Sequence, residues 1–142
     1  MKTSAAILLV ATLPMMTACG QDSKPAAAAE TVKDGVLHVN AAAARKLVEG
    51  AKEKKVIVLD VRTPEEFKAG HLKGAFNADF NGKEFAKAVA ELDKEATVVV
   101  HCQAGGRSKR SLPKLKELGF KNLVHLDGGF GDWEAAGFPV EK

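Results

Sequence analysis

The 142-residue sequence has no tyrosine, one tryptophan and two cysteines, Cys19 and Cys102. Two cysteines cannot build the disulfide framework of a small loop-rich domain, and their surroundings differ so much that we do not expect them to pair. The sequence also lacks a basic cluster, because its lysines are interspersed with acids and the formal net charge is +3. We therefore expect no nucleic-acid partner. The composition, with 46% hydrophobic and 27% charged residues, is typical of a single globular domain.

No apolar run in the sequence is long enough to span a bilayer. The run at residues 5–16 follows a single lysine and leads through small residues to Cys19. This layout resembles a bacterial lipoprotein signal, in which the cysteine is lipidated and becomes the mature N-terminus. Met16 stands where such signals usually have leucine, so cleavage near Ala18 without lipidation stays open.

From this layout we expect a signal peptide at residues 1–18, lipidation of Cys19 and a flexible tether at residues 19–35, which has no apolar periodicity. The domain would then be exported to the periplasm or the cell surface and held at a membrane by acyl chains on Cys19. Gly20 stands where aspartate would retain many Gram-negative lipoproteins in the inner membrane. The outer membrane is therefore favoured if the organism is Gram-negative.

From Val36 onward, short β-branched runs alternate with amphipathic helical stretches. This alternation predicts one α/β domain at residues 36–142, with a central, mostly parallel, five-stranded sheet between layers of helices. Asn40 is a predicted helix N-cap, and Thr63 and Glu66 are predicted to form a capping box. We expect strands at residues 36–39, 56–61, within 70–78, at 97–101 and at 122–126, and helices at 41–55, from 63, and at 81–93, 108–119 and 128–137.

Cys102 follows the expected strand at residues 97–101 and precedes two glycines and an arginine. Parallel sheets bind ligands at their carboxyl edge, and the amides that begin the next helix can stabilise a thiolate there. Gly105 and Gly106 can adopt positive φ, which would let successive amides surround an anion, and Arg107 adds a fixed charge. A structural cysteine needs no such loop, so we interpret Cys102 as a nucleophile. An anion-binding loop with an incidental thiol stays open.

The length of this loop helps to separate two kinds of cysteine enzyme. Four residues, Gln103 to Gly106, lie between Cys102 and Arg107. Cysteine phosphatases have one residue more between their cysteine and arginine. A shorter loop makes a narrower nest of amides, which suits a terminal sulfur atom better than a tetrahedral phosphate. The spacing therefore favours sulfur chemistry.

Three motifs in order resemble the rhodanese homology domain over nearly all of residues 36–142. They read VIVLDVRTPEEFKAGHLKGAFNA, VVVHCQAGGRS and GFKNLVHLDGGFGDWEAAGFPVE. The resemblance implies a rhodanese-like fold and a single-domain sulfurtransferase. In such an enzyme Cys102 takes sulfane sulfur from a donor such as thiosulfate, holds it as a persulfide and passes it to cyanide or a thiol. The anion-binding loop implied by the resemblance consists of Gln103, Ala104, Gly105, Gly106, Arg107 and Ser108.

Other residues that match the family motifs have supporting roles. Asp60 and Arg62 end the neighbouring strand, where we expect a salt bridge and hydrogen bonds to the loop that shape the site. Glu66 is expected to act mainly as a cap. His71 lies in the Gly-His turn of the family, where we expect a structural role, and Trp133 is expected in the core or in a pocket wall.

The sequence gives no sign of a cofactor. His38, His101 and His125 show no metal-ligand spacing with carboxylates or cysteines, so we expect no metal. Gln103 and Ala104 are neutral, whereas members that prefer thiosulfate often have cationic residues just after the cysteine. The identity of the sulfur donor therefore stays open.

Two alternative functions remain. The first is a non-catalytic rhodanese module that binds a partner or carries sulfur for one, although the intact Cys102 argues against it. The second is a cysteine phosphatase or arsenate reductase, which the short loop disfavours. Such an enzyme would also need a general acid, for which Asp127 or Asp132 can be nominated only weakly.

Overall fold

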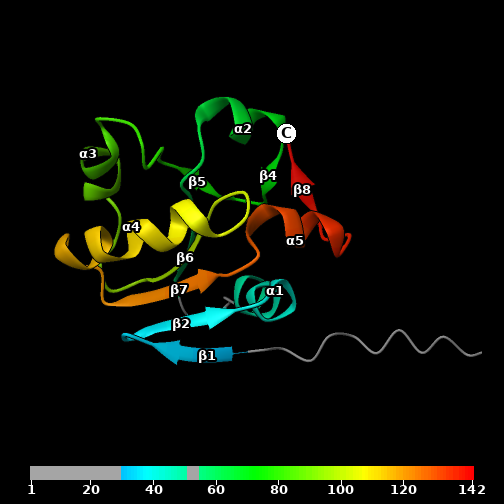
Figure 1. Cartoon of the computed structure of the whole chain (residues 1–142), viewed down its shortest axis with the longest axis horizontal. Coiled ribbons are helices and arrows are strands. Elements are labelled where there is room, and N and C mark those ends of the chain that lie inside the picture. Colours follow the sequence, from blue (N-terminus) through cyan, green and yellow to red (C-terminus); the bar gives the residue numbers. More distant parts are fainter. Residues whose placement is uncertain (1–29, 51–54) are drawn as a thin grey trace, which may run out of the picture.

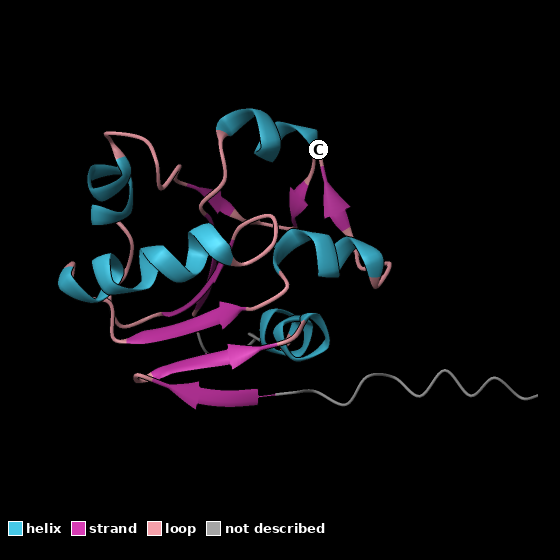
Figure 2. Cartoon of the chain, in the orientation of Figure 1, coloured by secondary structure: helices cyan, strands magenta, loops and turns pink. Residues whose placement is uncertain are grey.

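The computed structural model describes residues 30–50 and 55–142, which form a six-stranded sheet with helices on both faces and a separate two-stranded ribbon (Figure 1). Figure 2 shows the same elements by type. The strands are β1 (Glu30–Lys33), β2 (Val36–Val39), β3 (Val56–Asp60), β4 (His71–Leu72), β5 (Phe76–Asn77), β6 (Thr97–His101), β7 (Asn122–Leu126) and β8 (Val140–Glu141). The helices are α1 (Ala41–Glu49), α2 (Pro64–Ala69), α3 (Phe85–Ala90), α4 (Gly106–Glu117) and α5 (Gly129–Ala135).

The expected signal peptide, the first part of the expected tether and Cys19 lie outside the described residues. Among the helices of the two described ranges, none combines the length and the hydropathy that a bilayer crossing requires. The structure therefore describes the domain and does not test the signal peptide or the lipidation of Cys19.

The main sheet has the strand order β1-β2-β7-β6-β3-β5. The pairs β2–β7, β7–β6, β6–β3 and β3–β5 are all parallel, and these are the five strands that the sequence predicts. The ribbon of β4 and β8 is antiparallel and lies apart from this sheet. The predicted α/β fold with a mostly parallel central sheet is therefore confirmed.

Strand β1 corrects the lower boundary of the predicted domain, because it lies inside the expected tether at residues 19–35. It pairs antiparallel with β2 through a turn in which Asp34 and Gly35 have φ values of 51° and 71°. An Asp-Gly pair with two positive φ values is a favoured hairpin turn. Each residue of β1 is exposed, so no apolar alternation marks it as a strand. The fold therefore includes residues 30–35, and the main sheet has six strands where the sequence predicts five.

The helix caps predicted from the sequence are present. At α1, the side chain of Asn40 accepts a hydrogen bond from the amide of Ala43 at 2.9 Å. At α2, the Glu66 amide donates to Thr63 Oγ1 at 3.3 Å, and the Thr63 amide donates to Glu66 Oε2 at 3.1 Å. These bonds fix the first turns of the helices that follow β2 and β3.

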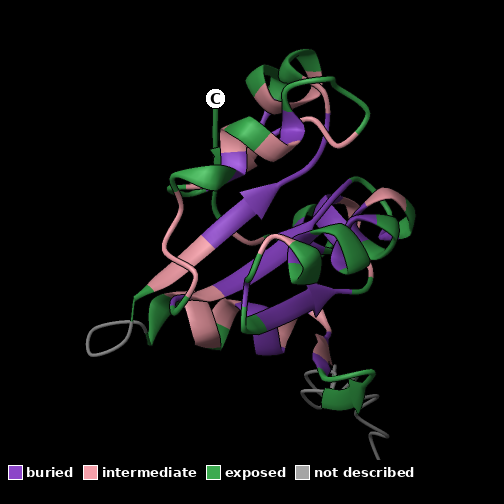
Figure 3. Ribbon diagram, turned by 90° about the vertical axis from the view of Figure 1, so that its left-hand side faces the viewer, coloured by how far each residue is buried: buried purple, intermediate pink, exposed green. Residues whose placement is uncertain are grey.

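Side chains of the central strands enter two cores, one on each face of the sheet. On β6, Val98 and Val100 pack with residues of α3 and α4, whereas Val99 packs with residues of α1 and α5. All three valines are 0% exposed, and Figure 3 shows the central strands as buried. Strands β3, β6 and β7 are parallel neighbours, so their carboxyl ends meet at one edge. Cys102 lies at this edge, immediately after β6.

Candidate active site

Cys102 lies in a short loop between β6 and α4 and is 2% exposed. Its Sγ atom accepts a hydrogen bond from the Gly105 amide at 3.1 Å. The hydroxyl of Ser108, on the first turn of α4, lies 3.5 Å from the same sulfur. The loop therefore folds around the thiol and presents hydrogen-bond donors to it.

These donors make Cys102 a stronger acid than an ordinary cysteine. Burial raises the pKa of the Cys102 thiol, but the hydroxyl of Ser108 and the backbone amides of Ser108, Ala104 and Gly105 outweigh it and lower the pKa below its ordinary value. The thiolate is the nucleophilic form of cysteine. The loop therefore favours the reactive state of Cys102.

Gly105 is the glycine of this loop that cannot be replaced without strain. It has a φ of +92°, and a Cβ atom there would lie 2.0 Å from the carbonyl oxygen of Asp127. Gly106 is the first residue of α4, and a Cβ atom there would meet nothing within 4 Å. Because α4 begins at Gly106, its backbone is helical, and the expectation of positive φ is wrong for Gly106.

The beginning of α5 holds the loop from its other side. The amides of Phe130 and Gly131 donate to the carbonyl oxygens of Cys102 at 2.8 Å and Gln103 at 3.0 Å. Gly129 permits this approach, because a Cβ atom there would lie 2.5 Å from the Cys102 oxygen. The carbonyl and the amide of one peptide group point in opposite directions. Because the carbonyls of Cys102 and Gln103 point toward α5, the amides of the same peptide groups point away from α5, toward the side of the sulfur.

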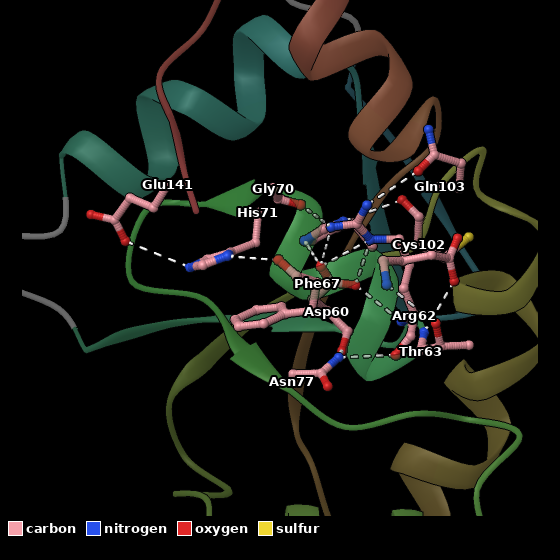
Figure 4. A network of polar contacts seen from close by, with 12 residues as sticks. Asp60, Arg62, Thr63, Phe67, Gly70, His71, Asn77, Cys102, Gln103 and Glu141 are labelled. Carbon is pink, nitrogen blue, oxygen red and sulfur yellow. Dashed lines mark hydrogen bonds and ion pairs between the residues drawn. The ribbon is translucent and has the colours of Figure 1, made fainter.

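Arg62 connects the end of β3 to the loop (Figure 4). Its Nη2 atom lies 2.7 Å from Asp60 Oδ2, and both side chains are almost fully buried. The guanidinium also donates to the Gly70 carbonyl at 2.7 Å and to Gln103 Oε1 at 3.2 Å. Asn77 donates to the carbonyls of Asp60 and Arg62 at 3.1 Å and 2.9 Å. The expected salt bridge and the expected bond to the loop are therefore confirmed.

Glu66 binds Arg107 and offsets part of the positive charge that Arg107 brings to the loop. Two parallel hydrogen bonds of 2.7 Å join the guanidinium of Arg107 to the carboxylate of Glu66. The bond to Arg107 is the main cause that lowers the pKa of Glu66 to about 2, and the same bond raises the pKa of Arg107. The sequence predicts Glu66 mainly as a helix cap. It does not predict the ion pair of Glu66 with Arg107, because the two residues are 41 positions apart in the sequence.

Three further polar side chains lie near the loop, His38 on β2, His125 on β7 and Asp127 just after β7, and we call them the histidine cluster. The Nδ1 atoms of both rings lie 2.7 Å from Asp127 Oδ1. His125 Nε2 lies 2.8 Å from the hydroxyl oxygen of Ser108. Sequence spacing gives no sign of a metal site, yet the fold gathers two imidazoles and a carboxylate here, and within the described residues no other such group of ligands occurs.

Burial and hydrogen bonds set the charges in this cluster. Burial lowers the pKa of His125, so the ring is neutral at neutral pH. Partial burial raises the pKa of Asp127, but hydrogen bonds from His38 and His125 outweigh it and lower the pKa. Asp127 is therefore a carboxylate engaged by two rings, which makes it a poor general acid for Cys102.

His71 and Trp133 have the structural roles that the sequence predicts. The ring of His71 stacks on Phe67 with 3.8 Å between centroids, and its Nδ1 atom lies 3.0 Å from the Phe67 carbonyl oxygen. Trp133 is 4% exposed and donates from Nε1 to the carbonyl of Pro139 at 2.9 Å. Neither side chain is placed to react.

His101 is fully buried beneath the site. Within the described residues, its Nε2 atom is the buried side-chain polar atom that lacks a hydrogen-bond partner, and it lies 3.7 Å from Asp60 Oδ2. Burial lowers the pKa of His101, and the nearby Asp60 carboxylate offsets only part of that effect. The unfolded chain therefore binds a proton below about pH 6.5 that the folded chain does not bind.

We expect the free energy of unfolding to fall as the pH falls below about 6.5, with His101 contributing up to about 1.4 kcal/mol per pH unit. The His101→Leu variant should lose stability less steeply, because it lacks this titrating group while all others remain. Urea unfolding of both proteins between about pH 7.5 and 5 measures the two slopes. Equal slopes would show that His101 is not held neutral by the fold.

Comparison with known proteins agrees with this architecture. Residues 43–136 match the family described as Rhodanese-like domain. Thiosulfate sulfurtransferase GlpE of Shewanella oneidensis is 35% identical over 91 residues, which cover 64% of this chain and 88% of that protein. Thiosulfate sulfurtransferase 16, a chloroplastic protein of Arabidopsis thaliana, is 33% identical over 93 residues, with 58% and 78% of the two chains covered.

Solved structures with a similar fold include a rhodanese-related protein. The crystal structure of a rhodanese-related protein from Thermoplasma volcanium has a TM-score of 0.63 and 29% sequence identity, and the match covers 73% of this chain and 96% of that one. The family match at residues 43–136 includes the end of β3, the Cys102 loop and the beginning of α5. The chain is a member of the rhodanese-like domain family.

Proposed function

We propose that this protein is a sulfurtransferase that carries sulfane sulfur as a persulfide on Cys102. The observation that carries the proposal is a buried thiol at the end of β6 whose pKa the surrounding loop lowers. Two relatives in the same family bear the name thiosulfate sulfurtransferase, which supports this reaction class. With thiosulfate as donor and cyanide or a thiol as acceptor, the reaction is a double displacement through one nucleophile.

In the first step, the Cys102 thiolate attacks the outer sulfur of thiosulfate. The bond between the two thiosulfate sulfurs breaks, sulfite leaves with the electron pair, and Cys102 becomes a persulfide anion. In the second step, cyanide attacks the outer sulfur of the persulfide, the bond between the two persulfide sulfurs breaks, and its electron pair restores the Cys102 thiolate while thiocyanate is released. The two leaving groups are sulfite and then the Cys102 thiolate, which the loop stabilises, so neither step needs a general acid. Asp127 is bound by two imidazole rings and is not available as a general acid, and this reaction does not require one.

The loop would stabilise each charged species in turn. The Gly105 amide and the Ser108 hydroxyl already face the Cys102 sulfur, and donors fixed before the reaction do not have to reorganise when charge moves. Gln103 and Ala104, the two residues after Cys102, are exposed and carry no charge. Because the Glu66 carboxylate lies beside Arg107, it reduces the electrostatic attraction of the loop for a dianionic donor.

Replacing Glu66 by glutamine should therefore improve binding of thiosulfate. Glutamine retains the cap on Thr63 and a hydrogen bond to Arg107 but removes the negative charge. We expect the KM for thiosulfate to fall about threefold at low ionic strength with little change in kcat. Glu65→Gln, which removes the same charge from the exposed neighbouring position, is the matched control and should leave KM unchanged. A higher KM in Glu66→Gln would show that the ion pair itself organises the donor site.

The proposed function is tested by incubating the full chain with thiosulfate and cyanide and measuring thiocyanate. We expect thiocyanate to form catalytically, with sulfite as the second product in equal amount. A parallel assay with a phosphate ester tests the phosphatase alternative. Hydrolysis of the ester without any sulfur transfer would overturn the proposal and favour that alternative.

We also propose that Cys19 is lipidated and holds the domain at a membrane surface. The support is the sequence layout before Cys19, which resembles a lipoprotein signal. Labelled palmitate should be incorporated into the full chain when it is expressed in cells, and not into the Cys19→Ser protein. Equal labelling of both proteins, or labelling of neither, would contradict the anchor.

A further inference from the structure

The histidine cluster is a preformed set of metal ligands beside the active-site loop. His38 and His125 are register partners on β2 and β7, and Asp127 follows the end of β7. The two Nδ1 atoms lie 3.3 Å from each other and 2.7 Å from the same oxygen of Asp127. The Asp127 amide donates to the Val39 carbonyl at 3.0 Å, which fixes the backbone of the third ligand. Three potential ligand atoms, from two paired strands and the residue after β7, therefore lie close together.

The spacing of these atoms suits a small divalent ion. Zinc binds imidazole nitrogen and carboxylate oxygen at about 2.0–2.2 Å, usually with four ligands in a tetrahedron. The three atoms are 2.7, 2.7 and 3.3 Å apart, so an ion just off their common plane can lie about 2 Å from each of them. A small outward movement of the exposed Asp127 side chain would bring the two shorter separations to the roughly 3.3 Å of a tetrahedral site. The side chains of His38 and His125 are 13% and 2% exposed, whereas that of Asp127 is 56% exposed. The cluster is therefore open to solvent on the carboxylate side, where water can supply a fourth ligand.

We propose that His38, His125 and Asp127 bind a divalent transition-metal ion, Zn²⁺ by their ligand chemistry, and that this ion controls the hydrogen bond from Ser108 to Cys102. Imidazole nitrogen and carboxylate oxygen are groups that bind zinc, and the cluster offers two of the first and one of the second close together. The site does not depend on the proposed sulfur transfer.

Ser108 links the cluster to the thiol. Its hydroxyl oxygen lies 2.8 Å from His125 Nε2, 3.0 Å from the Gly105 carbonyl oxygen and 3.5 Å from Cys102 Sγ. A hydroxyl has a single proton, so Ser108 can donate to one of these acceptors at a time. Without a metal, His125 donates from Nδ1 to Asp127, and its Nε2 atom is then an acceptor that competes for the Ser108 proton.

A metal ion on Nδ1 of His125 reverses this hydrogen bond. The Nδ1 lone pair then binds the ion, the ring proton resides on Nε2, and Nε2 donates to the Ser108 oxygen. His125 no longer competes for the Ser108 proton, which is left for Cys102 Sγ or the Gly105 carbonyl. Because a hydrogen bond to sulfur favours the thiolate, metal binding should lower the pKa of Cys102 further.

Zinc titration of the full chain by calorimetry tests the site, with Cys19→Ser as the background so that this thiol does not compete. We expect one ion per chain, with affinity reduced at least about tenfold in His38→Asn and in Asp127→Asn. His71→Asn, a histidine outside the cluster, is the matched control and should bind as before. No saturable binding, or equal affinity in His38→Asn, would overturn the site. So would a cobalt spectrum with a thiolate-to-metal band that disappears in Cys102→Ser, because the ion would then lie on the thiol.

The pH profile of Cys102 alkylation by iodoacetamide tests the link to the thiol. In the Cys19→Ser background, Zn²⁺ should move the midpoint to lower pH, with about threefold more thiolate below the midpoint. The midpoint of His38→Asn should not respond to the same Zn²⁺ concentration. An unchanged midpoint in protein that has bound zinc would overturn the link. Neither readout uses sulfur transfer, so failure here and failure of the sulfurtransferase proposal are distinguishable.

Discussion

Replacing Cys102 by serine is expected to reduce thiocyanate formation from thiosulfate and cyanide by about 10³-fold or more. A serine hydroxyl at this position stays protonated near neutral pH, and its oxygen cannot form the persulfide that the double displacement requires. Serine differs from cysteine by one atom and can accept the Gly105 hydrogen bond that the sulfur now accepts. The loss should therefore arise from chemistry and not from unfolding.

The matched control for this variant is Cys19→Ser, which removes the other thiol of the chain. We expect it to retain full sulfur transfer, because the proposed double displacement uses no thiol of the chain besides that of Cys102. Circular dichroism and thermal unfolding should show that both variants are folded. Residual transfer within tenfold of the unmodified protein in Cys102→Ser would mean that the proposed nucleophile is wrong.

Replacing Gly105 by alanine is expected to lower the free energy of unfolding by about 2–4 kcal/mol and kcat/KM by about 100-fold. The backbone at Gly105 has a φ of +92°, which L residues rarely adopt, and the new Cβ atom would lie 2.0 Å from the Asp127 carbonyl oxygen. The clash is with backbone, so the loop must move. Movement of the loop shifts the Gly105 amide away from Cys102 and weakens the bond that favours the thiolate.

Gly119→Ala separates the two causes of this loss. Gly119 also has a φ of +92°, but a Cβ atom there would meet nothing within 4 Å, and the residue lies beyond the far end of α4. Alanine at position 119 therefore introduces the backbone strain without the clash. We expect it to lower the free energy of unfolding by about 1 kcal/mol and to leave the activity unchanged. Urea unfolding and thiocyanate assays of both variants measure the difference. Equal effects of the two substitutions on activity would contradict the role of the close approach at Gly105.

Local patterns in the sequence were sufficient to predict the path of the chain to the site. The Thr63 cap, the apolar strand at residues 97–101 and the Cys102 loop each depend on residues close together in sequence. Parallel pairing then brings Asp60 beside His101, because the two neighbouring strands end at the same edge of the sheet. The expected position of Cys102, and the salt bridge that supports its loop, follow from these local rules.

The partners of the polar side chains could not be predicted in the same way. Glu66 and Arg107 are 41 residues apart, and the rings of His38 and His125 are 87 residues apart. Each pair meets because of strand order and helix placement, which no local motif encodes. Local sequence also could not distinguish Gly105 from Gly106, because the difference between them depends on where α4 begins and on the nearby Asp127 backbone.

The most direct test of the account is mass spectrometry of the Cys102 peptide after the full chain has been treated with thiosulfate and freed of small molecules. We expect this peptide to gain one sulfur atom, sulfite to be released in equal amount, and cyanide to remove the added sulfur as thiocyanate. A Cys102 peptide that remains unmodified, while sulfur transfer proceeds or while Cys19 alone gains sulfur, would contradict the assignment of Cys102 as the persulfide carrier.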